Sequence, residues 1–114
     1  MLRNHKNTAL KLHKHAEVFA ALGDRTRLTL VAKLADGRSR SISDLTEGTR
    51  LTRQAVTKHL RILEEVGVVH NSKAGRETLY ELDAKPMRSL QECLEVIGSQ
   101  WDDALGRLKR FVED

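Results

Sequence analysis

Apolar residues recur at steps of three or four along much of the chain, which is the spacing of a helix with one buried face. The clearest case begins after Thr52 and ends at Gly67. Two earlier stretches follow the same rule and end near Gly23 and Gly37. The predicted buried stripes consist of Leu12, Ala16, Phe19 and Leu22 in the first helix, Leu28, Val31 and Leu34 in the second, and Val56, Leu60, Leu63 and Val66 in the helix after Thr52.

Small polar residues stand where these helices should begin, because their side chains can accept a hydrogen bond from a free backbone N–H group. Asp24 and Thr52 are predicted to cap the second and fourth helices. Ser43 is predicted to cap a short third helix over Asp44–Glu47, after a connector that is either a loop or a strand. The turn Gly48–Leu51 then separates two helices by about the length that a helix-turn-helix requires.

The periodicity changes after Gly67. Two short segments, Val68–Lys73 and Arg76–Leu82, flank Ala74-Gly75, where the glycine can supply the positive φ of a tight hairpin. Pro86 lies where a last helix can begin.

From Pro86 to the end of the chain, the apolar stripe is longer than the core of a small domain needs. Burying one Leu-sized side chain contributes roughly 1.5–3 kcal/mol, so several such residues on each of two copies can hold a dimer together. The first helix is expected to contribute as well. The predicted dimer interface consists of Phe19, Leu22, Met87, Leu90, Leu94, Ile97, Trp101, Leu105, Leu108 and Val112.

Positive charge is concentrated beside the stripe of the fourth helix. No acidic residue occurs from Thr49 to Leu63, and a helix that is buried on one side and carries long donors on the other suits the major groove of DNA. His59 lies beside the stripe and is expected to be packed or hydrogen-bonded rather than to contact a base. The predicted DNA contacts are Thr49, Arg50, Thr52, Arg53, Gln54, Thr57, Lys58 and Arg61, with Lys73 and Arg76 at the hairpin tip.

The composition limits the other classes of protein. The 114 residues fit one domain, and a net charge of +4 with a pI near 9.5 favours polyanionic partners. The single cysteine, Cys93, excludes an internal disulfide and is typical of a reducing compartment. We find no apolar run that could span a bilayer and no secretory signal, so we expect a soluble cytoplasmic protein without a membrane partner.

Several stretches resemble the ArsR-type winged-helix repressors of bacteria and archaea. They are FAALGDRTRLTLVAKL (Phe19–Leu34), ISDL (Ile42–Leu45), LTRQAVTKHLRILEEVGVV (Leu51–Val69) and GRETLYELD (Gly75–Asp83). WDDALGRLKRF (Trp101–Phe111) resembles the long dimerising last helix of some members. The resemblance implies a homodimer that binds a palindromic operator and represses transcription until an inducer lowers its affinity for DNA.

We therefore expect a mostly α fold with a small β-hairpin, a winged helix-turn-helix that dimerises through its first and last helices. Residues 1–13 are predicted to form a polar N-terminal arm or the ragged start of the first helix. Residues 14–83 are predicted to form the DNA-binding domain, and residues 84–114 the dimerisation helix.

The sensor motif of this family is Cys-Val-Cys-Asp-Leu, and the same stretch here is Ser41-Ile42-Ser43-Asp44-Leu45. A serine hydroxyl stays protonated at neutral pH and is a poor ligand for soft metals. The family's other metal site needs carboxylate and histidine ligands on the last helix, which has acidic residues but no histidine. We therefore predict no metal site and no cofactor.

Two alternatives remain open from the residues. The N-terminal histidines (His5, His13 and His15) or Cys93 could make the protein a metal- or redox-responsive repressor. A helical adaptor that docks an acidic protein through its basic face is the other alternative. An enzyme is not expected, because the sequence has no phosphate-binding glycine loop, no His-Glu-x-x-His motif and no Cys/His metal quartet.

Overall fold

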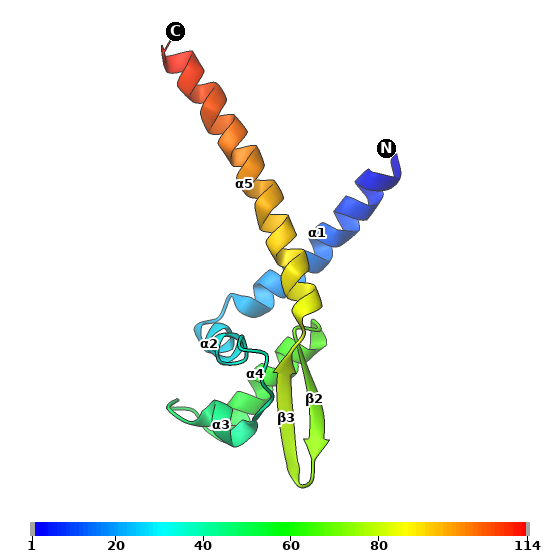
Figure 1. Cartoon of the computed structure of the whole chain (residues 1–114), viewed down its shortest axis with the longest axis vertical. Coiled ribbons are helices and arrows are strands. Elements are labelled where there is room, and N and C mark those ends of the chain that lie inside the picture. The colour runs from blue at the N-terminus through cyan, green and yellow to red at the C-terminus, as the bar shows by residue number, and fades with distance from the viewer. Residues whose placement is uncertain (1, 114) are drawn as a thin grey trace.

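The computed structural model describes the backbone of residues 2–113 and the side chains of residues 12–113. Figure 1 shows the short helices and the hairpin from the middle of the chain gathered at one end, while the long first and last helices cross and then diverge toward the other end. The expected fold, mostly helical with a small β-hairpin, is confirmed, and a short third strand joins the hairpin. In chain order the elements are α1 (Leu2–Leu22), α2 (Arg25–Lys33), β1 (Arg40–Ser41), α3 (Ile42–Thr46), α4 (Arg53–Glu65), β2 (Val69–Ala74), β3 (Glu77–Leu82) and α5 (Ala84–Glu113).

The sheet has three antiparallel strands in the order β1-β3-β2. Ala74 pairs with Glu77, so the hairpin loop is Gly75-Arg76, one residue later than the predicted Ala74-Gly75. Gly75 has a φ of +64°, which an L side chain rarely adopts, and it therefore occupies the first position of this two-residue loop.

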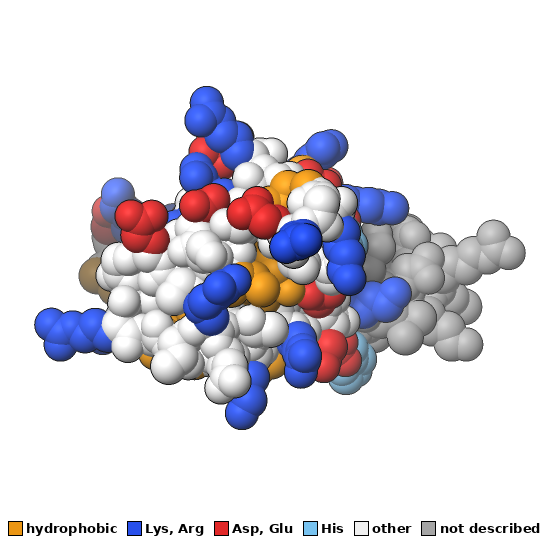
Figure 2. Space-filling view, turned by 90° about the horizontal axis from the view of Figure 1, so that it is seen from below, with side chains coloured by type: hydrophobic (Ala, Val, Ile, Leu, Met, Phe, Trp, Pro, Cys, Tyr) orange, Lys and Arg blue, Asp and Glu red, His pale blue; other side chains and the backbone are white. Residues whose placement is uncertain are grey.

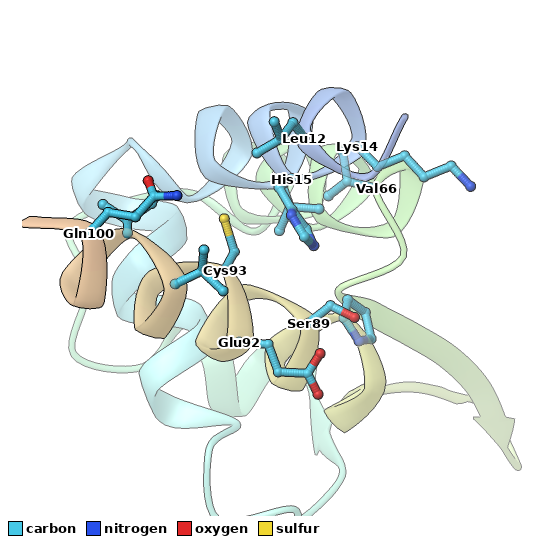
Figure 3. A pocket seen from close by; sticks show the side chains of 12 residues that line it. Leu12, Lys14, His15, Val66, Ser89, Glu92, Cys93 and Gln100 are labelled. Atoms are coloured by element: carbon cyan, nitrogen blue, oxygen red, sulfur yellow. The ribbon is translucent and has the colours of Figure 1, made fainter. Parts of the chain in front are cut away.

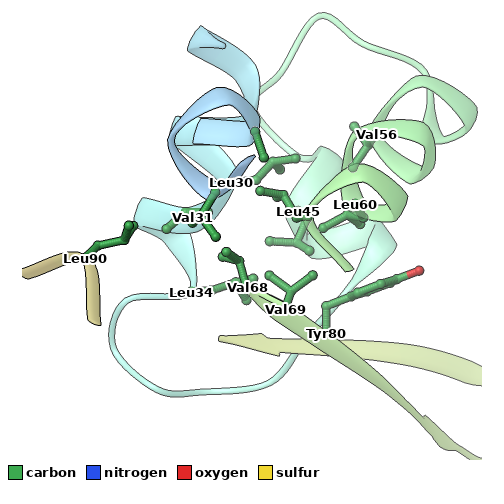
Figure 4. Close-up of a cluster of buried hydrophobic side chains, with 13 residues drawn as sticks. Leu30, Val31, Leu34, Leu45, Val56, Leu60, Val68, Val69, Tyr80 and Leu90 are labelled. Carbon is green, nitrogen blue, oxygen red and sulfur yellow. The ribbon is translucent and has the colours of Figure 1, made fainter. Parts of the chain in front are cut away.

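The core lies between α2, α3, α4 and the root of the hairpin (Figure 4). The stripe of α4 behaves as predicted, because Val56, Leu60 and Leu63 are fully buried and Val66 packs against their edge. Tyr80 closes the core from β3, and burial raises the pKa of its phenol. The fully buried residues are Leu30, Leu34, Leu45, Val56, Leu60, Leu63, Val68 and Val69.

The predicted stripes of α1 and α2 need correction. In α2, Leu28 is 54% exposed, and Leu30 is buried in its place because that side faces the core. In α1, Leu12 and Phe19 are exposed, whereas Val18 and Ala21 face the core. Val31 and Leu34 of α2 are buried as predicted, and Leu22 of α1 packs against the core. Tertiary packing thus shifts the buried face to one side of each predicted stripe and does not replace the whole stripe.

The helix starts follow the capping prediction in two of three cases. Asp24 and Thr52 accept hydrogen bonds from the backbone N–H groups of Arg27 and Ala55. The cap of α3 is Ser41 rather than Ser43, because Ser41 ends β1 in the extended conformation that a cap requires.

At the N-terminus the backbone of residues 2–13 is helical and continuous with the rest of α1, so these residues are the start of the first helix. The domain division of the chain at residue 13 remains a prediction. No helix between residues 2 and 113 has the length and apolarity that crossing a membrane requires.

Candidate nucleic-acid interface

The helix α3 and the helix α4, joined by a short turn, form a helix-turn-helix. Gly48 supplies a positive φ of 79° in this turn. The end of α3 is held from α2, because Lys33 Nζ donates to the carbonyl oxygens of Leu45 at 3.2 Å and Glu47 at 3.0 Å. The last carbonyls of a helix have no partner within the helix, so Lys33 satisfies groups that would otherwise need water. No pattern in the sequence indicated this role of Lys33.

The outward face of α4 carries long side chains whose donors are free. Arg53, Gln54, Lys58 and Arg61 are exposed, and so is Arg50 in the preceding turn. Within residues 12–113, their side chains take part in none of the hydrogen bonds or ion pairs of the structure. The space-filling view of this end of the molecule shows Lys and Arg side chains spread across it (Figure 2). These donors are available to an external acceptor.

The threonines of the predicted DNA contacts have local roles in the chain. Thr49 Oγ1 donates to the carbonyl of Thr46 at 2.6 Å, and Thr57 Oγ1 donates to that of Arg53 at 2.7 Å. Thr52 Oγ1 caps α4 through Ala55 N at 3.1 Å. Thr49 and Thr57 thus offer an outside partner only an oxygen acceptor and a methyl group, and their contact with DNA remains a prediction.

The hairpin extends toward the same end of the molecule as α3 and α4 (Figure 1). Lys73 and Arg76 are exposed at its tip. Two contacts fix its root: Asn71 Nδ2 donates to Glu64 Oε2 of α4 at 2.7 Å, and His70 Nε2 lies 2.6 Å from Asp83 Oδ2. The hydrogen bond with His70 lowers the pKa of the Asp83 carboxyl. The Asn71–Glu64 bond thus connects the root of the hairpin with α4.

A polar cluster of Asp24, Arg27 and His59 joins α1, α2 and α4. The Nε atom of Arg27 donates to the carbonyl of Ala21 in the last turn of α1, and its Nη1 lies 3.3 Å from His59 Nδ1 in α4. Asp24 Oδ2 is 3.9 Å from the same Nδ1. The backbone hydrogen bond from Arg27 lowers the pKa of the Asp24 carboxyl, and the charge of Arg27 adds to the effect. His59 is hydrogen-bonded within the protein, as the sequence suggested.

An apolar stripe lies exposed along α5. Leu90 is buried in the core of its own chain and anchors the root of the helix, whereas the predicted interface residues beyond it are open to solvent. The exposed fractions are 54% for Leu94, 51% for Ile97, 64% for Trp101, 47% for Leu105, 58% for Leu108 and 75% for Val112, and Phe19 of α1 is 36% exposed.

A groove of about 610 Å³ lies where α1 and α5 diverge (Figure 3). Leu12, Val96 and Ile97 line it with apolar side chains, and so does Val66, the residue that follows α4. The Nδ1 atom of His15 is buried there without a hydrogen-bond partner among the described residues.

The groups proposed as alternative sensors are dispersed. Among the described side chains, no three His, Cys, Asp or Glu residues lie close enough together to hold a metal ion. Ser41 Oγ accepts from Asp44 N at 3.1 Å and so belongs to the cap of α3. Cys93 is a free, half-buried thiol beside the groove. The side chain of His5 lies outside the described residues, so its role remains a prediction.

Comparison with known proteins identifies the family. The family model described as "Bacterial regulatory protein, arsR family" matches residues 24–71, from the cap of α2 into β2. The uncharacterized HTH-type transcriptional regulator YuzN of Bacillus subtilis is 30% identical over 79 residues, which cover 64% of this chain and 86% of YuzN. The chain belongs to the ArsR family. ArsR-family proteins are winged helix-turn-helix transcriptional regulators, not enzymes. Because a helix-turn-helix binds DNA, double-stranded DNA is the expected partner of this chain.

Solved structures agree with this ArsR assignment. An ArsR-like transcriptional regulator from Rhodococcus sp. RHA1 has a TM-score of 0.72 and 36% identity, with 88% of this chain and 93% of that chain covered. The homodimeric winged helix-turn-helix DNA-binding domain Mb0332 from Mycobacterium bovis has a TM-score of 0.62 at 21% identity, with 88% and 89% covered. The first similarity supports the ArsR family, and the second shows the fold alone.

Proposed function

We propose that two copies of the chain pair through α1 and α5, and that this homodimer represses transcription by occupying a palindromic operator in promoter DNA. The observation that carries the proposal is the solvent-exposed apolar stripe of α5. Trp101 is 64% exposed and Leu108 is 58% exposed within one chain. Contiguous apolar surface of this kind marks a protein interface, because leaving it in water is costly.

The groove between α1 and α5 supports the same pairing. A helix of the second copy that entered the groove would cover Leu12, Val96 and Ile97. It would also bring a polar group within reach of the buried Nδ1 atom of His15. The homodimeric state of Mb0332, which shares this fold, is a further argument.

The paired chains would present two copies of α4 to one side of a duplex. Recognition helices of such dimers lie about one DNA turn apart, roughly 34 Å, and each enters the major groove. Gln54 is suited to adenine, and Arg53, Lys58 and Arg61 to guanine or phosphate. Phosphate contacts would supply most of the affinity, whereas the few base contacts would select the sequence.

Repression then follows from occupancy of the promoter. A ligand that binds more tightly to a dimer in which the two copies of α4 are wrongly spaced would lower the population of the DNA-binding form. The operator would then be released. Such a regulator acts in the cytoplasm, where the chromosome of a bacterium lies.

Selection of bound fragments from random DNA tests the proposal. We expect a palindrome whose half-sites are centred about 10 base pairs, or a multiple of a helical turn, apart. Recovery of single half-sites would contradict the dimer. Failure to retain DNA on a column at low salt would favour the helical adaptor instead.

Replacing Lys73 and Arg76 by alanine is expected to weaken binding to specific and random DNA alike. Each lost phosphate contact should reduce the slope of log affinity against log salt by about 0.9. Fluorescence anisotropy over a salt series measures the slope. Arg107→Ala with Arg110→Ala removes the same charge from exposed positions of α5 and should leave the slope nearly unchanged. Equal slopes in the two double variants would show that the hairpin tip does not touch the duplex.

A further inference from the structure

We propose that Arg27 and His59 are positioning residues that fix α4 against α1, and that DNA affinity depends on them although neither touches DNA. The inference rests on the proposed function, because it concerns the orientation of α4 relative to α1, a helix of the proposed dimer interface. The contacts of Arg27 support the inference.

Arg27 bonds two helices at once. Its Nε atom donates to the backbone carbonyl of Ala21, and its Nη1 atom reaches His59 Nδ1 at 3.3 Å. A guanidinium holds its donors in a rigid planar fork, so two bonds from one fork constrain both distance and angle between the groups it joins. The bond from Arg27 requires that Nδ1 of His59 accept, and the Asp24 carboxylate, 3.9 Å from the same atom, completes the polar surroundings of the ring without a second hydrogen bond.

His59 is on the wrong side of α4 to read DNA. At 100° per residue, it lies about 170° around the helix from the centre of the arc formed by Arg53, Gln54, Thr57, Lys58 and Arg61. Its side chain is only 24% exposed. The ring therefore faces α2, and a change at this position alters the seating of the helix rather than a contact with a base.

The other end of the cluster lies beside the proposed dimer interface. Ala21 lies between Phe19 and Leu22, two α1 residues predicted to contact the second copy. Arg27 thus connects α4, through His59, with α1, through Ala21. In the proposed dimer, α1 helps to set the distance between the two copies of α4. Loss of this tie should harm simultaneous binding of two half-sites more than binding of one.

The experiment compares variants on the palindrome selected by the wild-type protein and on a duplex with one half-site scrambled. We expect Arg27→Ala and His59→Leu each to weaken binding to the palindrome by about tenfold, the effect that one charge-assisted hydrogen bond supports. Binding to the scrambled duplex should change less, and the salt slope should not change. His59→Asn, which keeps an acceptor near the position of Nδ1, should recover most of the affinity.

Arg25→Ala is the matched control, because it removes the same charge from an exposed position two residues earlier. The double variant Arg27→Ala/His59→Leu should lose no more than either single variant, since the two residues act as one unit. Should Arg27→Ala fail to fold, the pair His59→Leu and His59→Asn makes the same comparison.

Three outcomes would overturn the inference. One is wild-type affinity in His59→Leu, and another is a salt slope lowered by about 0.9 for each copy of the chain in Arg27→Ala, which would make Arg27 a phosphate contact. The third is equal weakening on both duplexes. Wild-type protein that selects no palindrome would instead refute the proposed function, so the two failures are distinguishable.

Discussion

Trp101→Asp is expected to convert the dimer into monomers and to abolish operator binding. Trp101 is 64% exposed in one chain and lies near the middle of the exposed α5 stripe. Truncating a buried aromatic residue costs about 3–5 kcal/mol, and a carboxylate in an apolar interface adds to that cost. Dimer affinity should therefore fall by more than about 100-fold. Sedimentation equilibrium at low micromolar concentration and anisotropy with the operator measure the two effects.

Ser99→Asp is the control for this substitution. It places the same charge two residues away on the exposed opposite side of α5, so it should leave both dimer and DNA binding intact. A Trp101→Asp variant that is still dimeric at low micromolar concentration would refute the α5 interface. A monomeric variant that binds the palindrome as tightly as the wild type would instead show that DNA binding does not require dimerisation.

Leu63→Ala is expected to lower the free energy of unfolding by about 2–5 kcal/mol. Leu63 is fully buried on the inner face of α4, and truncating it leaves a cavity between this helix and the core. Because small domains are stabilised by only about 5–15 kcal/mol, this loss is a large share of the total. Urea unfolding followed by circular dichroism gives the value at one fixed protein concentration.

The neighbouring Ile62 provides the comparison, because it loses the same number of carbon atoms on truncation and is 38% exposed. Ile62→Ala should cost less than about 1 kcal/mol. Equal losses in the two variants would mean that the buried face of α4 is not the one described.

The sequence was sufficient to predict α4 because independent signals agree there. The stripe of Val56, Leu60 and Leu63, the cap at Thr52 and the stop at Gly67 all define the same helix, and its outward donors follow from the same periodicity. In the neighbouring hairpin the loop moved by one residue, since either of two turn placements is compatible with one glycine.

The sequence was not sufficient where an apolar side chain had more than one partner to choose from. In α1, Val18 and Ala21 face the core, whereas Leu12 and Phe19 stand outside it. Periodicity identifies apolar rows, but it does not say which row packs on the same chain and which remains free. The short helix α2 posed the same problem between Leu28 and Leu30.

Within the site, the long donors of α4 and the internal role of His59 were predictable, whereas the roles of the basic residues that hold α3 and α4 from α2 were not. Arg27 and Lys33 act on carbonyl groups that are distant along the chain or belong to another helix. Such bonds depend on how the helices are placed in space, and a lysine or arginine on a helix surface has no pattern that distinguishes this use from plain solvation.

Both described ends of the chain point away from the surface formed by α4 and the hairpin (Figure 1). A fluorescent protein or an affinity tag joined after α5 would extend outward from a bound duplex rather than across it. Live-cell imaging and immobilisation on a sensor chip can therefore use fusions at this end without a long spacer.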